Sequence, residues 1–205
     1  IGVASTKAFL GQILVLYILA LKLGSLRNEI EKKIYQKKIK DLKALPGLIE
    51  KTLLHDNDIQ SISSTFNEAR GSMFLGRGFS YPIALEGALK LKEISYIHAA
   101  GYPAGEMKHG PIALLDKKVP VISIASPGEV FDKVISNAQE AKARDSYLIG
   151  IAPECDGTEI FDYLFQIPSS TEWVTPLLNI IPLQLLSYHI AAHRGLDVDQ
   201  PRNLA

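Results

Sequence analysis

Three charged residues recur at helical spacing near the middle of the chain. Glu86, Lys90 and Glu93 follow one another at intervals of four and three residues. At 100° per residue, their side chains fall within about 60° of one another on one helical face. A carboxylate beside an ammonium, with an imidazole such as that of His109 nearby, can move protons at neutral pH. The same spacing is also typical of a solvated helix face, with a weak ion pair between Glu86 and Lys90.

The residues before and after this stripe predict the elements that position it. The apolar run 72–75 leads into the turn Gly76-Arg77-Gly78, and a helix is expected from Tyr81 to Tyr96. Small or apolar side chains on the opposite helical face could pack against a sheet: Ala84, Ala88, Leu91 and Ser95. A polar loop, 106–111, carries His109 and ends in Gly110-Pro111. Ligands of open α/β sheets bind at the carboxyl ends of strands, where such turns lie, so this context favours an acid–base site.

Apolar runs and helical patterns alternate over the rest of the chain. Five strands are expected: 72–75, 98–101, 119–125, 147–152 and 164–167. Helices are expected from a cap at Ser5 to Leu23, ended by Gly24; over 27–55, broken or kinked at Pro46-Gly47; from Asp56 or Asp58 to Ala69; and over 81–96, 129–143 and 175–193. Apolar strands without alternation, separated by helices, indicate a parallel sheet covered on both faces. We predict an α/β, doubly wound, five-stranded, flavodoxin-like domain.

Composition excludes several classes of function. The chain is 47% apolar and 21% charged, with zero net charge and no basic runs, so neither nucleic acid nor a membrane surface is an expected partner. The single cysteine, Cys155, indicates a reducing, cytoplasmic setting, and no His or Cys spacing suits a metal. The apolar segment 8–23 is short for a membrane span and contains Gln12 and Lys22, so a helix buried between layers is expected.

Five motifs together resemble the isomerase half of the glutamine–fructose-6-phosphate aminotransferase family (glucosamine-6-phosphate synthases), which is built from sugar-isomerase (SIS) domains. The motifs are Val-Ala-Ser-Thr-Lys-Ala-Phe at 3–9, Leu-Gly-Arg-Gly at 75–78, Ala-Leu-Glu-Gly-Ala-Leu-Lys-Leu-Lys-Glu at 84–93, Gly-Glu-Met-Lys-His-Gly-Pro at 105–111 and Asp-Val-Asp-Gln-Pro-Arg-Asn-Leu-Ala at 197–205. The resemblance covers essentially the whole chain. It divides the chain into a remnant of a first SIS lobe (1–28), a second SIS domain (29–195) and a C-terminal tail (196–205).

The resemblance implies a role for each residue of the stripe. Glu93 matches the family's base, which shuttles a proton between C1 and C2 of the sugar. Lys90 and Glu86 match its neighbours on the same face, and Lys90 would hold the base ionised and polarise the sugar oxygens. His109 matches the residue that opens the sugar ring, contributed across a homodimer interface. Neither a metal nor an organic cofactor is implied.

The ends of the chain carry further expectations from the resemblance. Val3, Ser5 and the tail through Ala205 match the part of the family's site that holds sugar phosphate. The family's imine-forming lysine would follow Ala205, its phosphate loop would precede Ile1, and Cys155 cannot replace the cysteine of its glutaminase domain. We therefore expect a fragment that binds sugar phosphate poorly and does not make glucosamine 6-phosphate alone. By composition, the polar tail 196–205 is equally compatible with a frayed end.

Two alternatives to the synthase remain. SIS domains also serve as non-catalytic sugar-phosphate sensors, but that role predicts a degraded pair at Glu93 and His109 or a fused DNA-binding segment, and neither is visible. Another SIS enzyme, such as an amino-sugar deaminase or isomerase, would use the same base but not the tail at 197–205.

Overall fold

The computed structural model describes residues 2–202, and its centre is a parallel sheet. The strands are β1 (Ser72–Gly76), β2 (Ala99–Pro103), β3 (Val121–Ile124), β4 (Leu148–Ala152) and β5 (Tyr163–Gln166). They are ordered β2-β1-β3-β4-β5, and every neighbouring pair is parallel. This is the flavodoxin-like order, so the predicted fold class is confirmed.

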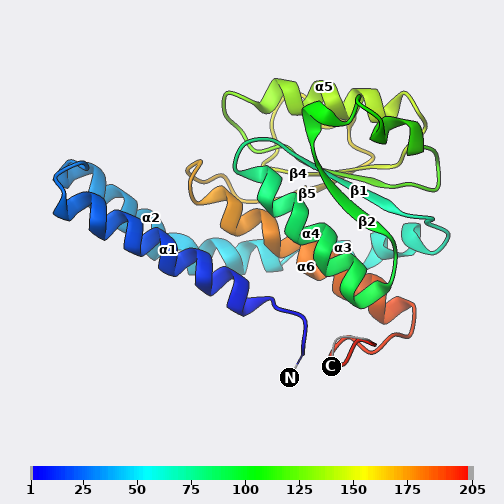
Figure 1. Cartoon of the computed structure of the whole chain (residues 1–205), viewed down its shortest axis with the longest axis horizontal. Helices are drawn as coiled ribbons and strands as arrows, with labels where there is room; N and C mark the ends of the chain where they lie inside the picture. Colours follow the sequence, from blue (N-terminus) through cyan, green and yellow to red (C-terminus); the bar gives the residue numbers. More distant parts are fainter. Residues whose placement is uncertain (1, 203–205) are drawn as a thin grey trace.

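Helices cover both faces of the sheet, as its apolar strands predict. α5 (Phe131–Lys142) lies on one face, while α3 (Asp56–Ile62), α4 (Ser80–Ser95) and α6 (Thr175–His193) lie on the other (Figure 1). Successive strand residues point to opposite sides, so Met73 and Leu75 join the core beneath α5 while Phe74 joins the core with α4 and α6. In the described part of the chain, four short 3₁₀ helices fill the connections: Ser63–Phe66, Ala104–Glu106, Pro111–Leu114 and Thr158–Ile160.

The first two helices form a long hairpin that projects from the sheet domain. α1 (Lys7–Leu26) and α2 (Lys32–Leu53) lie side by side and reach beyond the sheet (Figure 1). The expectation that α1 is buried between layers is wrong for this chain, because Leu21 is its only buried residue. Its inner side packs partly against the main core, whereas Val15, Leu16 and Leu23 are 63, 61 and 49% exposed. By length and composition alone, α1 could also cross a membrane.

Helix boundaries near the N-terminus differ from the prediction. Ser5 does not cap α1, whose N-cap is Thr6, and Gly24 lies inside the helix instead of ending it. A Cβ at Gly24 would lie 2.5 Å from the Ile30 side chain, so this glycine permits close packing at the turn between the helices. Pro46 does not end α2. The next α-helix ends at Ile62 and continues only as a 3₁₀ turn to Phe66, short of Ala69.

Candidate functional site

The turn between β1 and α4 sets the direction of the charged helix. A Cβ at Gly76 would lie 2.3 Å from the carbonyl oxygen of Ser80, and Gly78 has φ of +53°, so both positions require glycine. α4 begins directly after this turn and runs back along the sheet toward the amino ends of the strands. The predicted strand–turn–helix unit is therefore present.

Small residues fix α4 against its neighbours. Ala84, Ala88 and Leu91 are at most 1% exposed and belong to the main core, as their place opposite the stripe predicts. A Cβ at Gly87 would lie 2.6 Å from Leu183 of α6 and 3.1 Å from the ring of Phe74, so this glycine allows α4 to approach α6 closely. Close packing on this side holds the polar stripe in one orientation.

Lys90 joins the stripe into one charged cluster. Its Nζ donates to Glu93 Oε2 at 2.6 Å and lies 3.5 Å from Glu86 Oε1. The side chains of Lys90, Glu86 and Glu93 are only 4, 12 and 21% exposed. The stripe is therefore not a solvated helix face. A buried ammonium between two carboxylates is a costly arrangement unless the charges stay paired, and it is typical of functional sites.

The environment of Glu86 differs from that of an ordinary surface carboxyl. Burial raises the pKa of Glu86, and the charge and hydrogen bond of Lys90 act against this shift without cancelling it. The charge of Glu93 raises the pKa of Glu86 further. Glu86 therefore favours its protonated form more than a surface carboxyl does, while the ammonium of Lys90 contacts Glu93. The cluster thus places a carboxyl that binds a proton readily beside a carboxylate paired with a positive charge.

The stripe lies away from the carboxyl edge of the sheet. Glu93 follows Ser80 by thirteen residues of helix, or about 20 Å, in the direction of the amino ends of the strands. Glu93 therefore does not lie at the carboxyl ends of the strands, where ligands of open α/β sheets bind. The turn at Gly78 does lie there, and it lines a cavity with Ser126 and Gly128, beyond the ends of β1 and β3.

His109 belongs to the opposite edge and is not brought to Glu93 within this chain. Its loop follows the carboxyl end of β2, anchored by the fully buried side chain of Met107. The imidazole is 72% exposed, and its Nδ1 lies 2.8 Å from Glu106 Oε2. Lys108 turns away to Glu140 on α5, at 2.7 Å. The predicted polar loop thus forms, but its imidazole faces solvent.

The two ends of the described chain meet near the C-terminal end of α4. The backbone N–H of Val3 donates to the carbonyl oxygen of Asp199 at 2.9 Å. Arg202 donates its backbone N–H to Tyr96 Oη at 2.8 Å, and Pro201 is buried. Figure 1 shows the segment before α1 and the segment after α6 below the sheet, close to each other. The tail through Arg202 is therefore not a frayed end.

The remaining predicted binding residues lie near this meeting point or outside the described range. Ser5 is exposed, next to Thr6, whose carbonyl oxygen accepts a hydrogen bond from Gln184 Nε2 of α6 at 3.5 Å. Ala205 lies outside the described residues. Tyr96 was not predicted, because spacing and composition do not reveal that a helix end meets a segment more than a hundred residues later.

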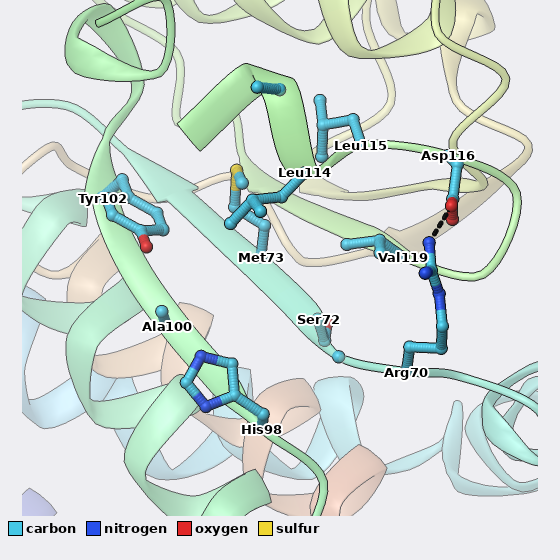
Figure 2. Close-up of a pocket in the computed structure, with 12 residues that line it drawn as sticks. Arg70, Ser72, Met73, His98, Ala100, Tyr102, Leu114, Leu115, Asp116 and Val119 are labelled. Atoms are coloured by element: carbon cyan, nitrogen blue, oxygen red, sulfur yellow. Dashed lines mark hydrogen bonds and ion pairs between the residues drawn. The ribbon is translucent and has the colours of Figure 1, made fainter. Parts of the chain in front are cut away.

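A separate pocket of about 350 Å³ lies beside the edge strand β2. Figure 2 shows Ala100 and Tyr102 of β2 along one side, Leu114 and Leu115 on the other, and the Arg70–Asp116 ion pair at one end. No predicted site residue lines this pocket.

The structure offers no alternative metal or thiol chemistry within residues 2–202. No group of three or more His, Cys, Asp or Glu side chains is placed there to hold a metal ion. Burial and the charges of Asp156 and Glu159 raise the pKa of Cys155, so its thiol is protonated at neutral pH and is a weak nucleophile.

Comparison with known proteins points to one group of enzymes. The chain is 59% identical over 208 aligned residues to a glutamine–fructose-6-phosphate aminotransferase (isomerizing) of a Nostoc species, and 58% identical to one of Synechocystis. Each match covers the whole chain but only 33% of the relative, so the chain spans about a third of the length of these proteins.

Solved structures show the same relationship. The C-terminal domain of glucosamine-fructose-6-phosphate aminotransferase from Francisella tularensis superposes with a TM-score of 0.92 at 44% identity, over 98% of this chain and 57% of that one. A glucosamine-6-phosphate deaminase from Thermotoga maritima shares the fold, with a TM-score of 0.73 at 23% identity. The family model of the SIS domain matches residues 65–194. This match covers more than half of the chain, and the sheet order and the relatives agree with it. The chain therefore belongs to the SIS domain family.

Proposed function

We propose that the chain forms part of the isomerase half of a glutamine–fructose-6-phosphate aminotransferase. The buried cluster of Glu86, Lys90 and Glu93 carries the proposal, because it supplies a paired carboxylate on a rigid helix. The identity of 59% over the whole chain supports the choice among SIS enzymes. In the proposed reaction, ammonia from glutamine condenses with fructose 6-phosphate, and the product isomerises to glucosamine 6-phosphate.

Glu93 acts as the base in this proposal. Its carboxylate takes a proton from C1 of the amino-sugar intermediate and returns it to C2, so the carboxylate is regenerated and no oxidant or reductant is consumed. The ammonium of Lys90, 2.6 Å from Glu93, stabilises the carboxylate before the transfer and faces the developing charge on the sugar oxygens. Glu86 Oε1, 3.5 Å from Lys90 Nζ on the other side, holds the ammonium in place.

The exposure of His109 supports a site shared between two subunits. The imidazole is 72% exposed, and its loop lies at the edge of the sheet opposite the Glu93 end of α4. We propose a homodimer in which His109 of one subunit opens the sugar ring at the Glu93 site of the other. The proposed partners are thus sugar phosphate, a second copy of the chain and a glutaminase domain of the same protein, in the cytoplasm.

The exposed side of α1 supports the proposed domain boundary near residue 28. Residues 1–28 would complete a preceding SIS lobe, with the domain of 29–195 and the tail 196–205 after it. Leu16, 61% exposed here, would then be buried in the full-length protein. Leu16→Lys should leave the melting temperature of this chain nearly unchanged and lower that of the full-length protein. Equal effects on both would refute the boundary.

The proposed function is tested with Glu93→Gln in the full-length protein. This change keeps the size of the side chain but removes the base, so synthesis of glucosamine 6-phosphate should fall by at least about 10²-fold, while glutamine hydrolysis continues. Glu68→Gln is the matched control, because Glu68 is 82% exposed and forms a surface ion pair with Lys118 at 3.4 Å. Near-normal synthesis by the Glu93→Gln protein would refute the assignment of the base.

A further inference from the structure

Tyr96 occupies a position that disfavours its residue type. It ends α4 in the left-handed conformation, with φ of 62° and ψ of 14°. Glycine or asparagine is the usual residue at such a helix end, because a bulky side chain makes this conformation costly. The contacts of the Tyr96 side chain compensate for this unfavourable backbone conformation.

Both parts of the Tyr96 side chain contact the C-terminal tail. The hydroxyl accepts the backbone N–H of Arg202 at 2.8 Å, and the guanidinium of Arg202 lies over the phenol ring at 4.2 Å from its centroid. A hydrogen bond and a cation–π contact thus join the same two residues, which are 106 positions apart. Glycine would suit the backbone at position 96 but would make neither contact.

The part of the tail between α6 and Arg202 has a regular structure of its own. Gly195, with φ of 67°, donates its N–H to the carbonyl of Ala192, and Leu196 donates to that of Ala191, which closes α6 in a Schellman motif. Asp197 Oδ1 then accepts the N–H groups of Asp199 and Gln200, each at 2.9 Å. The tail therefore forms an ordered turn next to the end of α4.

The same tail also holds the N-terminal segment. The carbonyl oxygen of Asp199 accepts the N–H of Val3 at 2.9 Å, and a Cβ at Gly2 would lie 3.2 Å from Asp199 Oδ1. The tail thus bridges two parts of the proposed site: the segment of Val3 on one side, and on the other the end of α4, where Tyr96 follows Glu93 by three residues.

We propose that Tyr96 is a positioning residue that anchors the C-terminal tail at Arg202, and so sets the tail between the Glu93 end of α4 and the Val3 segment. The inference rests on the proposed function, since it assigns this end of α4 to the sugar-phosphate site. Misplacement of a site segment by about 1 Å can reduce turnover by 10²-fold, so an anchor of this kind affects the reaction without touching the substrate.

The test uses Tyr96→Gly and Tyr96→Phe in the full-length protein. Glycine suits the left-handed backbone, so Tyr96→Gly should retain or raise the melting temperature while it frees the tail. We expect deuterium exchange in the peptide that begins at Leu196 to become at least about tenfold faster, and kcat for synthesis to fall by about tenfold or more. Tyr96→Phe keeps the ring contact and loses only the acceptor, so its effects should be intermediate.

Asn28→Gly is the matched control. Asn28 has φ of 58° in the turn between α1 and α2, so the same kind of backbone relief occurs away from the tail. This variant should change neither the exchange of the tail nor synthesis, and glutamine hydrolysis should continue in all three variants.

Unchanged exchange of the tail in Tyr96→Gly would overturn the anchor. Faster exchange with unchanged synthesis would overturn the positioning role, and so would a loss of synthesis that merely follows a lower melting temperature. The exchange measurement needs no catalysis, so it decides about the anchor even if Glu93→Gln refutes the proposed function.

Discussion

Replacing Lys90 by methionine removes the charge that joins the stripe and keeps most of the side-chain volume. The two carboxylates beside it would remain 12 and 21% exposed, without their shared ammonium. Removing one partner of a fully buried ion pair costs about 3–5 kcal/mol. Because both carboxylates here keep some contact with water, we expect a loss of about 2–3 kcal/mol of the free energy of unfolding at pH 7.

Thermal unfolding of this chain measures the loss directly. For a domain of about this size, each kcal/mol shifts the melting temperature by about 2–4 °C, so Lys90→Met should melt about 4–12 °C lower than the unmodified chain. Lys92→Met is the matched control, because Lys92 lies two residues along the same helix and is exposed. Its free energy of unfolding should change by no more than about 0.5 kcal/mol.

The deficit of Lys90→Met should depend on pH. Burial already raises the pKa of Glu86 above its ordinary value of 4.5, even with Lys90 present, and losing the ammonium raises it further. A carboxyl whose pKa is higher in the folded state binds protons preferentially there, so acidification stabilises the folded form. The deficit should therefore shrink as the pH falls from 7 toward 4.5. A melting temperature within about 1 °C of the unmodified chain at pH 7, or a deficit independent of pH, would refute this reasoning.

Two further predictions concern the shared site and the packing of glycines. Mixing Glu93→Gln and His109→Ala subunits of the full-length protein should restore part of the synthesis lost in each, because one mixed site keeps both groups; no recovery in verified mixed dimers would contradict a shared site. Gly87→Ala should cost about 1–3 kcal/mol, because its Cβ would lie 2.6 Å from Leu183, whereas Gly47→Ala in α2 meets nothing within 4 Å and should gain about 0.5–1 kcal/mol. Chemical unfolding of both variants checks the sign, and a shared sign would contradict the packing argument.

Local patterns were sufficient to predict the sheet and the common face of the charged stripe. The five strands are apolar runs bounded by turn residues, and parallel pairing follows from the helices between them. The spacing of Glu86, Lys90 and Glu93 predicted that they share one helical face, but it did not predict that they are buried. Burial depends on which elements pack around α4, and a window along the chain contains no such information.

Tertiary contacts, which the local sequence pattern does not contain, account for most of the differences. Gly24 reads locally as a helix end, yet Ile30 makes it a packing position inside α1. The composition of the tail predicts a polar, unstructured segment, yet hydrogen bonds with Tyr96 and Val3 hold it in place. The exposure of α1 is a third case, because an apolar helix is expected to be buried wherever a partner surface is available, and the described residues supply only part of one.

The position of α6 has a consequence for synthesis on the ribosome. α2, α3 and α4 all pack on α6, which follows them in the chain and is the last helix within residues 2–202. From Leu53 at the end of α2 to His193 at the end of α6 there are 140 residues. At about 5–20 residues per second, the helices made first wait roughly 7–28 s for the surface that covers them. During that interval their apolar sides are available to chaperones and to neighbouring nascent chains, so translation speed over the second half of the domain should affect the yield of folded protein.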